Sequence, residues 1–185
     1  MTAVLNKKIT VQEYLSREDF EEGFYYELIE GSIVKKSAPS PAHQNASVNL
    51  VVALSAFVRQ HQSGKIFAAP LDVFFDEFNA LEPDIIFIAK DRLSIITENG
   101  IEGVPDLVVE ILSPSTAKND RGDKMKVYRR TGVREYWIVD PRSLTLEVYV
   151  LRDGEFELDA FAAESGMVES QVLSGLNINV ADIFD

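Results

Sequence analysis

Two acidic side chains stand where a divalent cation could bind between neighbouring strands. Glu110 lies inside an apolar run, between Val109 and Ile111. A buried carboxylate without a partner costs several kcal/mol unless a cation or hydrogen bonds compensate it. Asp84 begins another apolar run, so paired strands could bring Asp84 and Glu110 to one ion. Oxygen ligands favour Mg²⁺ or Mn²⁺. The alternative is a Glu110 that faces solvent on an edge strand.

Asp106 shares a strand face with Glu110, but it lies four residues away. At about 3.3 Å per residue the separation is about 13 Å, which one ion cannot bridge directly. We therefore expect Asp106 to cap the end of its strand or to support the site from outside.

A helix predicted over residues 119–130 carries the next candidates. At about 100° per residue, Asp120, Lys124, Val127 and Tyr128 fall within one arc of about 100°. If Val127 and Tyr128 face the sheet, Asp120 and Lys124 also turn inward. A lysine beside a metal can stabilise charge on a reacting phosphate. The alternative is a surface Asp–Lys pair worth about 0.3–0.5 kcal/mol.

Two further residues could support such a site. Glu27 belongs to a predicted hairpin, and His43 is the third residue of a predicted helix, near the positive end of the helix dipole. His43 could orient a phosphate or a water molecule. A hairpin carboxylate and a structural histidine are the plain alternatives.

The hydrophobic pattern predicts the elements that position these side chains. A capping box from Thr10 to Glu13 opens a helix, and Glu30-Gly31 indicates a hairpin turn. Ser40-Pro41 opens a longer helix that runs to about Gln62, with Gly64 as its stop signal. We predict helices at residues 10–17, 40–62 and 119–130, and strands at 24–29, 32–37, 65–75, 84–89, 106–112, 135–140, 144–151 and 156–160. Because the central runs are apolar on both faces, we expect an α/β or α+β fold with a mixed sheet flanked by helices.

Composition limits the class of protein. The 185 residues fit a single domain over residues 1–185, with 46% hydrophobic residues, no cysteine and two histidines. A cysteine-ligated or all-histidine metal site is therefore excluded. No apolar run is long enough for a signal peptide or a membrane span, so we expect a cytoplasmic protein without membrane contact.

The net charge of −12 argues against a nucleic-acid partner. However, residues 118–134 hold seven basic and two acidic side chains, a local net charge of +5. This segment could serve as a local contact for DNA phosphates. The alternative is an ordinary solvated helix.

Taken together, these motifs resemble the PD-(D/E)XK nucleases and, more closely, the Uma-two family of bacterial endonucleases. The resemblance spans nearly the whole chain and rests on Tyr26-Glu-Leu-Ile-Glu-Gly31, Pro41-Ala-His43, Pro83-Asp84, Pro105-Asp-Leu-Val-Val-Glu-Ile-Leu-Ser-Pro-Ser115, Asp120, Lys124, Tyr128 and Gly132-Val-Arg-Glu-Tyr-Trp-Ile-Val-Asp-Pro141.

This resemblance implies a restriction-endonuclease-like fold and a metal-dependent phosphodiesterase. It implies Asp84 and Glu110 as ligands of Mg²⁺ or Mn²⁺, Lys124 as the charge-stabilising group, and supporting roles for Glu27, His43 and Asp120. Leu112 departs from the wider nuclease pattern, which has lysine two positions after the glutamate. In this chain the lysine would have moved to the following helix.

The leading hypothesis is therefore hydrolysis of DNA phosphodiester bonds. The alternatives are a catalytically silent module that binds nucleic acid or protein, and a metal phosphoesterase with a small substrate. We also expect a homodimer, because cutting both strands of a duplex takes two active sites, with its apolar surface supplied by residues 135–151.

Overall fold

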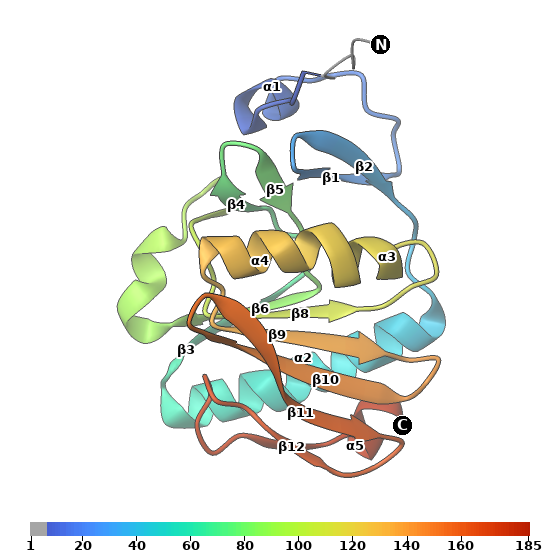
Figure 1. Cartoon of the computed structure of the whole chain (residues 1–185), viewed down its shortest axis with the longest axis vertical. Helices are drawn as coiled ribbons and strands as arrows, with labels where there is room; N and C mark the ends of the chain where they lie inside the picture. The colour runs from blue at the N-terminus through green and yellow to red at the C-terminus, as the bar shows by residue number, and fades with distance from the viewer. Residues whose placement is uncertain (1–6) are drawn as a thin grey trace.

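The computed structural model describes residues 7–185, which are built around a six-stranded mixed sheet. Figure 1 shows its arrangement. Its strand order is β11-β10-β9-β8-β6-β3. Only β8 and β9 run parallel, and the other neighbours are antiparallel. The strands are β3 (Gly64–Ala68), β6 (Ile85–Ala89), β8 (Leu107–Ile111), β9 (Glu135–Asp140), β10 (Thr145–Arg152) and β11 (Glu155–Ala163). The predicted mixed sheet flanked by helices is confirmed.

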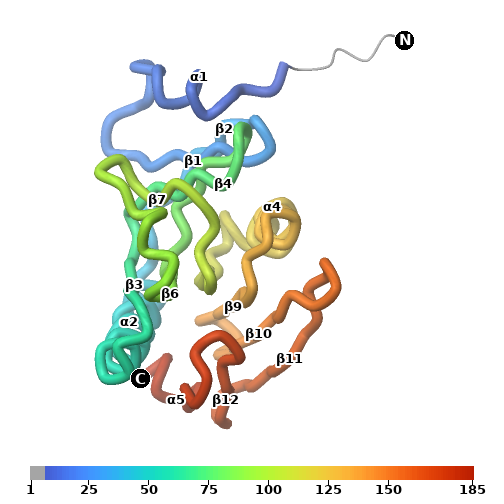
Figure 2. The backbone as a smooth tube through the Cα atoms, turned by 90° about the vertical axis from the view of Figure 1, so that its left-hand side faces the viewer, coloured from blue at the N-terminus to red at the C-terminus, as the bar shows by residue number. Residues whose placement is uncertain are grey.

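Helices cover both faces of this sheet, as Figure 2 shows for α2 (Pro41–His61) and α4 (Met125–Thr131). Successive strand residues face opposite sides. Ile85 and Phe87 of β6 pack in the cluster that contains the α2 side chains, whereas Ile86 and Ile88 pack with Val127 and Tyr128 of α4. This two-sided burial is the reason that the central strands are apolar at nearly every position.

Helix α2 begins and ends with local signals. Ser40 accepts a hydrogen bond from the backbone N–H of His43, and Pro41 occupies the first helical position. Gln62 ends the helix in the left-handed conformation, so the prediction that Gly64 stops it is wrong. Gly64 instead begins β3, where a Cβ would lie 2.1 Å from the carbonyl oxygen of Ile88. Close packing of β3 against β6 requires this glycine.

A second sheet of five strands carries the N-terminal hairpin. Its order is β2-β1-β5-β4-β7, with β1 (Tyr25–Ile29), β2 (Ser32–Lys36), β4 (Val73–Asp76), β5 (Asn79–Leu81) and β7 (Ile101–Glu102). Helix α1 (Val11–Leu15) precedes it and starts with the predicted capping box of Thr10 and Glu13. A 3-10 helix, Lys90–Ile95, follows β6.

The prediction of one strand over residues 65–75 is wrong. The chain leaves the six-stranded sheet after Ala68 and enters the five-stranded sheet at Val73. Pro70 lies between the two strands and has no N–H to donate to a ladder. A strand through this position could not continue its hydrogen bonding.

The helix predicted over residues 119–130 is built in three pieces. It consists of α3 (Ala117–Asn119), a π-helical turn (Asp120–Lys124) and α4. Asp120, Lys124, Val127 and Tyr128 are all buried, so the predicted inward face is confirmed. The π turn holds one more residue per turn than an α-helix, and such turns occur often at functional sites.

The C-terminal segment forms elements that the sequence did not predict. These are β12 (Met167–Glu169), β13 (Asn177–Asn179) and α5 (Ala181–Phe184), and α5 packs against α2. Buried Glu135 anchors this segment by accepting hydrogen bonds from the backbone N–H groups of Gln171 and Val172 and from Trp137. Within residues 7–185, no helix has the length and apolar character needed to cross a membrane.

Candidate active site

The register of β6 and β8 sets Asp84 beside Glu110. Ile85 pairs with Val109 in this antiparallel ladder, so the preceding residue on β6 faces the following residue on β8. Directly opposed residues point to the same side of a sheet. The Asp84 Oδ2 atom also accepts a hydrogen bond of 2.7 Å from the backbone N–H of Ile111. The two carboxylates therefore share one end of the sheet, on the face covered by α4.

Lys124 lies at the centre of a buried carboxylate cluster. Its Nζ atom is 2.9 Å from Oε1 of Glu110, 3.0 Å from Oε1 of Glu27 and 3.4 Å from Oδ1 of Asp120. Only 1% of the lysine is exposed. Tyr128, one helical turn further on, donates a hydrogen bond to the same Oε1 of Glu110. Three candidate carboxylates thus surround one ammonium group.

Glu27 is held by groups that the sequence did not single out. Its Oε1 accepts a 2.8 Å hydrogen bond from the backbone N–H of Glu82, and the Nζ of Lys36 lies 3.4 Å away. Tyr25 pairs with Lys36 across the hairpin, which places Lys36 diagonally from Glu27 on one face. The two-residue turn at Glu30-Gly31 fixes this register, so it was the signal that could have identified Lys36.

His43 reaches the cluster from the first turn of α2. Its Nε2 atom lies 3.3 Å from Oδ2 of Asp84, and its Nδ1 atom is buried without a hydrogen-bond partner among the described residues. The cap at Ser40 fixes the start of the helix and hence the position of the ring. His43 therefore contacts Asp84 directly and can orient it.

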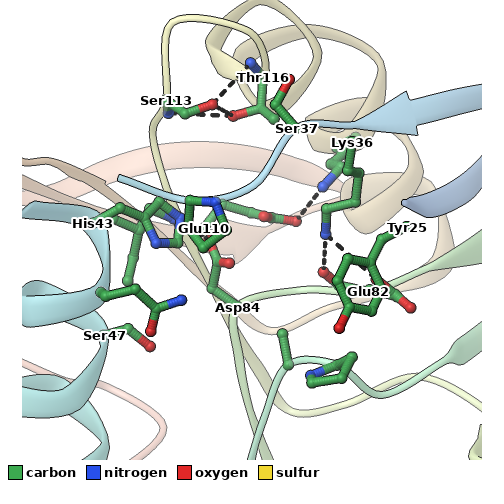
Figure 3. Close-up of a pocket in the computed structure, with 16 residues that line it drawn as sticks. Tyr25, Lys36, Ser37, His43, Ser47, Glu82, Asp84, Glu110, Ser113 and Thr116 are labelled. Atoms are coloured by element: carbon green, nitrogen blue, oxygen red, sulfur yellow. Dashed lines mark hydrogen bonds and ion pairs between the residues drawn. The ribbon is translucent and has the colours of Figure 1, made fainter. Parts of the chain in front are cut away.

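A pocket of about 260 Å³ opens beside these residues (Figure 3). Asp84, Glu110 and Lys124 line it together with His43. The other lining residues come from the hairpin, the start of α2, the segment between β3 and β4, and the loop before α3: Tyr25, Lys36, Ser37, Pro39, Gln44, Ser47, Ala69, Pro70, Glu82, Ile111, Ser113 and Thr116. The candidate chemistry is therefore accessible to a ligand.

The acidic and basic groups of the site have shifted pKa values. Burial raises the pKa of Glu110 to about 8, although Lys124 opposes the shift. Burial also acts to raise the pKa of Asp84, but the hydrogen bonds from His43 and the Ile111 N–H outweigh it and lower that pKa. Burial disfavours the charged form of Lys124, yet Glu110, Glu27 and Asp120 hold its pKa well above the ordinary value. Lys124 is therefore a cation throughout the neutral range.

The donor set suits a small divalent cation. None of the hydrogen bonds formed by residues 7–185 reaches Oδ1 of Asp84 or Oε2 of Glu110, so each carboxylate keeps one oxygen without a protein partner. The described residues contain no cage of three or more acidic or histidine ligands. Mg²⁺ needs no such cage, because it usually keeps several waters and takes one or two carboxylates together with substrate phosphate.

Asp106 lies apart from this cluster, near the opposite end of β8. Its carboxylate accepts hydrogen bonds of 2.8 Å from Arg92 and from the backbone N–H of Ala89, and Arg134 approaches within 3.4 Å. It is fully buried and does not line the pocket. Asp106 thus caps the end of β6, and it belongs to the fold rather than to the pocket.

We predict that Asp106→Asn lowers the free energy of unfolding but leaves cleavage per folded molecule unchanged. The substitution weakens the interaction with the Ala89 N–H and with two partly exposed arginines, for a cost of about 1–3 kcal/mol. Urea unfolding and a cleavage assay corrected for folded fraction check the two parts. A loss of activity beyond the loss of folded protein would place Asp106 in the active site.

The basic segment at residues 118–134 is not a free cationic surface. Arg121 pairs with Glu147, Arg129 with Glu155, and Arg130 with Glu30 and Asp76. Lys126 and Arg134 also have acidic partners, and Lys124 is buried. Carboxylates of other segments therefore offset much of the local charge, and the expected contact with DNA phosphates stays a prediction.

A solved structure with a similar fold indicates the class of protein. The fold matches a solved structure from Anabaena variabilis described as "a putative nuclease belonging to DUF820", with a TM-score of 0.75 and 26% sequence identity, over 95% of this chain and 97% of that one. The protein thus has a nuclease-like fold.

The family follows from the sequence. Residues 11–181 match the Uma2 family, described as "Putative restriction endonuclease", and the chain belongs to this family. It is also similar to an uncharacterized protein of Synechocystis sp., with 28% identity over 174 residues, which cover 91% of this chain and 96% of that protein. The family resemblance inferred from the motifs is confirmed.

Proposed function

We propose that the protein is a divalent-metal-dependent endonuclease that hydrolyses phosphodiester bonds of DNA in the cytoplasm. The observation that carries this proposal is the opposition of Asp84 and Glu110 across β6 and β8, in a pocket that Lys124 also lines; each carboxylate has one oxygen without a hydrogen-bond partner among residues 7–185. Membership of the Uma2 family supports it. The roles of the individual residues are part of the proposal.

Asp84 and Glu110 would hold Mg²⁺ or Mn²⁺ through their open oxygens. A bound divalent ion supplies Lewis-acid polarisation of a phosphoryl oxygen and helps to generate a nucleophile from water. His43 orients Asp84 through its contact with Oδ2. The Ile111 N–H fixes the same atom, so that Oδ1 is left for the ion.

Lys124 would compensate the charge that builds up on the scissile phosphate. Water adds to phosphorus, one P–O ester bond breaks, the leaving oxygen takes up a proton, and the second proton of the water passes to solvent. Lys124 is a permanent cation beside the pocket, and Glu27 and Asp120 hold its ammonium in place. Preorganised charge of this kind needs no rearrangement during the reaction.

The direct test is cleavage of supercoiled plasmid and of single-stranded DNA with Mg²⁺, with Mn²⁺ and with chelator. We expect metal-dependent nicking that chelator abolishes. The net charge of −12 and the neutralised basic segment favour the second candidate, a catalytically silent module that binds nucleic acid or protein. Absence of cleavage with every metal and both DNA forms, from folded protein, would favour that module.

We further propose that the chain forms a homodimer, but through a different surface from the one expected. Tyr136, Trp137 and Val148, in the segment predicted to supply the interface, are buried in the core. Val48 and Val52 of α2 are exposed by 57% and 64%, and α2 contains no acidic residue. The helix itself therefore adds no negative charge to a contact between two copies of this chain of net charge −12.

Sedimentation velocity tests the homodimer. We expect the wild-type protein to sediment as twice 20.7 kDa at high concentration and Val52→Glu to be monomeric, because it introduces like charges into the contact. Leu158→Glu, at an equally exposed apolar position of β11, should leave the dimer intact. A wild-type monomer at all concentrations would remove this proposal.

A further inference from the structure

The ammonium group of Lys124 lies between three buried acidic side chains. Oxygen atoms of Glu27, Glu110 and Asp120 lie 2.9–3.4 Å from its Nζ, and all four side chains are at most 3% exposed. A cation in the centre of this cluster stabilises the ionised form of its acidic groups, since unpaired charges are strongly unfavourable there. In this chain, the ammonium group provides that cation.

Asp120 gives independent support for a cation position. Its side chain is 1% exposed, and neither of its carboxylate oxygens has a hydrogen-bond partner within the described part of the chain. Its ion-pair partner is Lys124, four residues further along the π turn. The Asp120 carboxylate, which has no hydrogen-bond partner among the described residues, therefore lies beside the ammonium group of Lys124.

Glu110 joins this cluster to the pocket. Its Oε1 accepts hydrogen bonds from Lys124 and Tyr128, whereas Oε2 is without a described partner. Asp84 is not among the ion-pair partners of Lys124 and keeps Oδ1 open. The carboxylates thus form two adjacent cation positions with Glu110 in common. One is filled by Lys124, and the other opens to the pocket.

We infer that Lys124 takes the place of a second divalent ion, so that each chain binds a single Mg²⁺ or Mn²⁺, and that removing its charge creates a second ion site formed by Glu27, Glu110 and Asp120. The first ion in this inference rests on the proposed function. The second site needs only the Lys124 cluster. Mn²⁺ is a suitable probe, because it binds hard oxygen ligands such as these carboxylates.

The test counts Mn²⁺ ions bound per chain by electron paramagnetic resonance of free Mn²⁺ and by calorimetry. Lys124→Met keeps an aliphatic side chain but removes the charge, and circular dichroism verifies its fold. We expect one ion for the wild-type protein, two for Lys124→Met, and one again for Lys124→Met combined with Glu27→Gln. Lys36→Met also removes a cation near Glu27, but the ion pairs of Lys36 are with Glu27 and Glu82 and not with Glu110 or Asp120, so the count should stay at one.

Each outcome decides the inference. Two ions in the wild-type protein, or one ion in folded Lys124→Met, would overturn it while leaving metal-dependent cleavage intact. If Lys124→Met does not fold in buffer, Mn²⁺ should restore its fold if the ion replaces the ammonium, and failure to do so would count against the inference. No ion in the wild-type protein would overturn both this inference and the proposed metal dependence.

Discussion

Lys124→Ala is expected to lower the rate of DNA cleavage about 100- to 1000-fold, the usual effect of removing one preorganised electrostatic group. It should also lower the free energy of unfolding by about 3–5 kcal/mol, because it leaves the buried carboxylates of Glu27, Glu110 and Asp120 without their cation. Because Lys124 is 1% exposed, this loss is much larger than the loss of a surface Asp–Lys pair would be. Single-turnover cleavage and urea unfolding measure the two losses.

Lys126→Ala is the matched control. Lys126 lies two residues further on, is 68% exposed in its side chain and pairs with Asp123 on the surface. Its removal should change the free energy of unfolding by less than about 0.5 kcal/mol and leave the cleavage rate almost unchanged. Equal losses of rate in the two variants would mean that Lys124 acts only as one of several basic groups.

Divalent metal is expected to stabilise the fold, and to do so more strongly at pH 8 than at pH 6. Burial raises the pKa of Glu110 from 4.5 to about 8, so in the metal-free protein the group contributes stability below about pH 4.5 that is lost as the pH rises through 8. Metal binding has the opposite dependence, because the ion must displace the proton. One proton bound at pH 6 by a group of pKa 8 weakens metal affinity about 100-fold.

Thermal unfolding with Mn²⁺ at several pH values checks this expectation. An ion at 100 times its dissociation constant stabilises the native state by about 2.7 kcal/mol. Glu110→Gln cannot ionise and should remove most of both the metal effect and its pH dependence. Stabilisation that is as large at pH 6 as at pH 8 would contradict the raised pKa of Glu110.

The pairing of Asp84 with Glu110 could be predicted because it depends on local patterns. Asp84 lies directly before the short strand β6, and Glu110 lies within β8. Because successive strand residues point to opposite faces of the sheet, their positions determine the face to which each carboxylate points. The inward face of Asp120 and Lys124 likewise follows from helical periodicity, even though a π turn replaces the regular helix. Buried polar residues in apolar runs were the informative signal.

Contacts between distant segments could not be predicted in this way. Arg121 pairs with Glu147 of β10, and Arg129 pairs with Glu155 of β11. These pairs form because the two strands lie beside the helical segment, and the periodicity of the sequence does not predict that arrangement. The break between β3 and β4 depends on a second sheet receiving the chain. The short elements after Ala163 have too few residues for a pattern to emerge.

Metal-dependent nicking of supercoiled plasmid by Asp84→Asn, measured beside the wild-type protein and Asp123→Asn, tests the central claim most directly. Asp123 is an exposed aspartate on the π turn, so its replacement controls for preparation and for the loss of one charge. We expect the wild-type protein and Asp123→Asn to nick the plasmid equally with Mg²⁺ or Mn²⁺, and Asp84→Asn to be slower by about 100-fold or more. Equal nicking by all three proteins would contradict the assignment of the active site to Asp84 and Glu110.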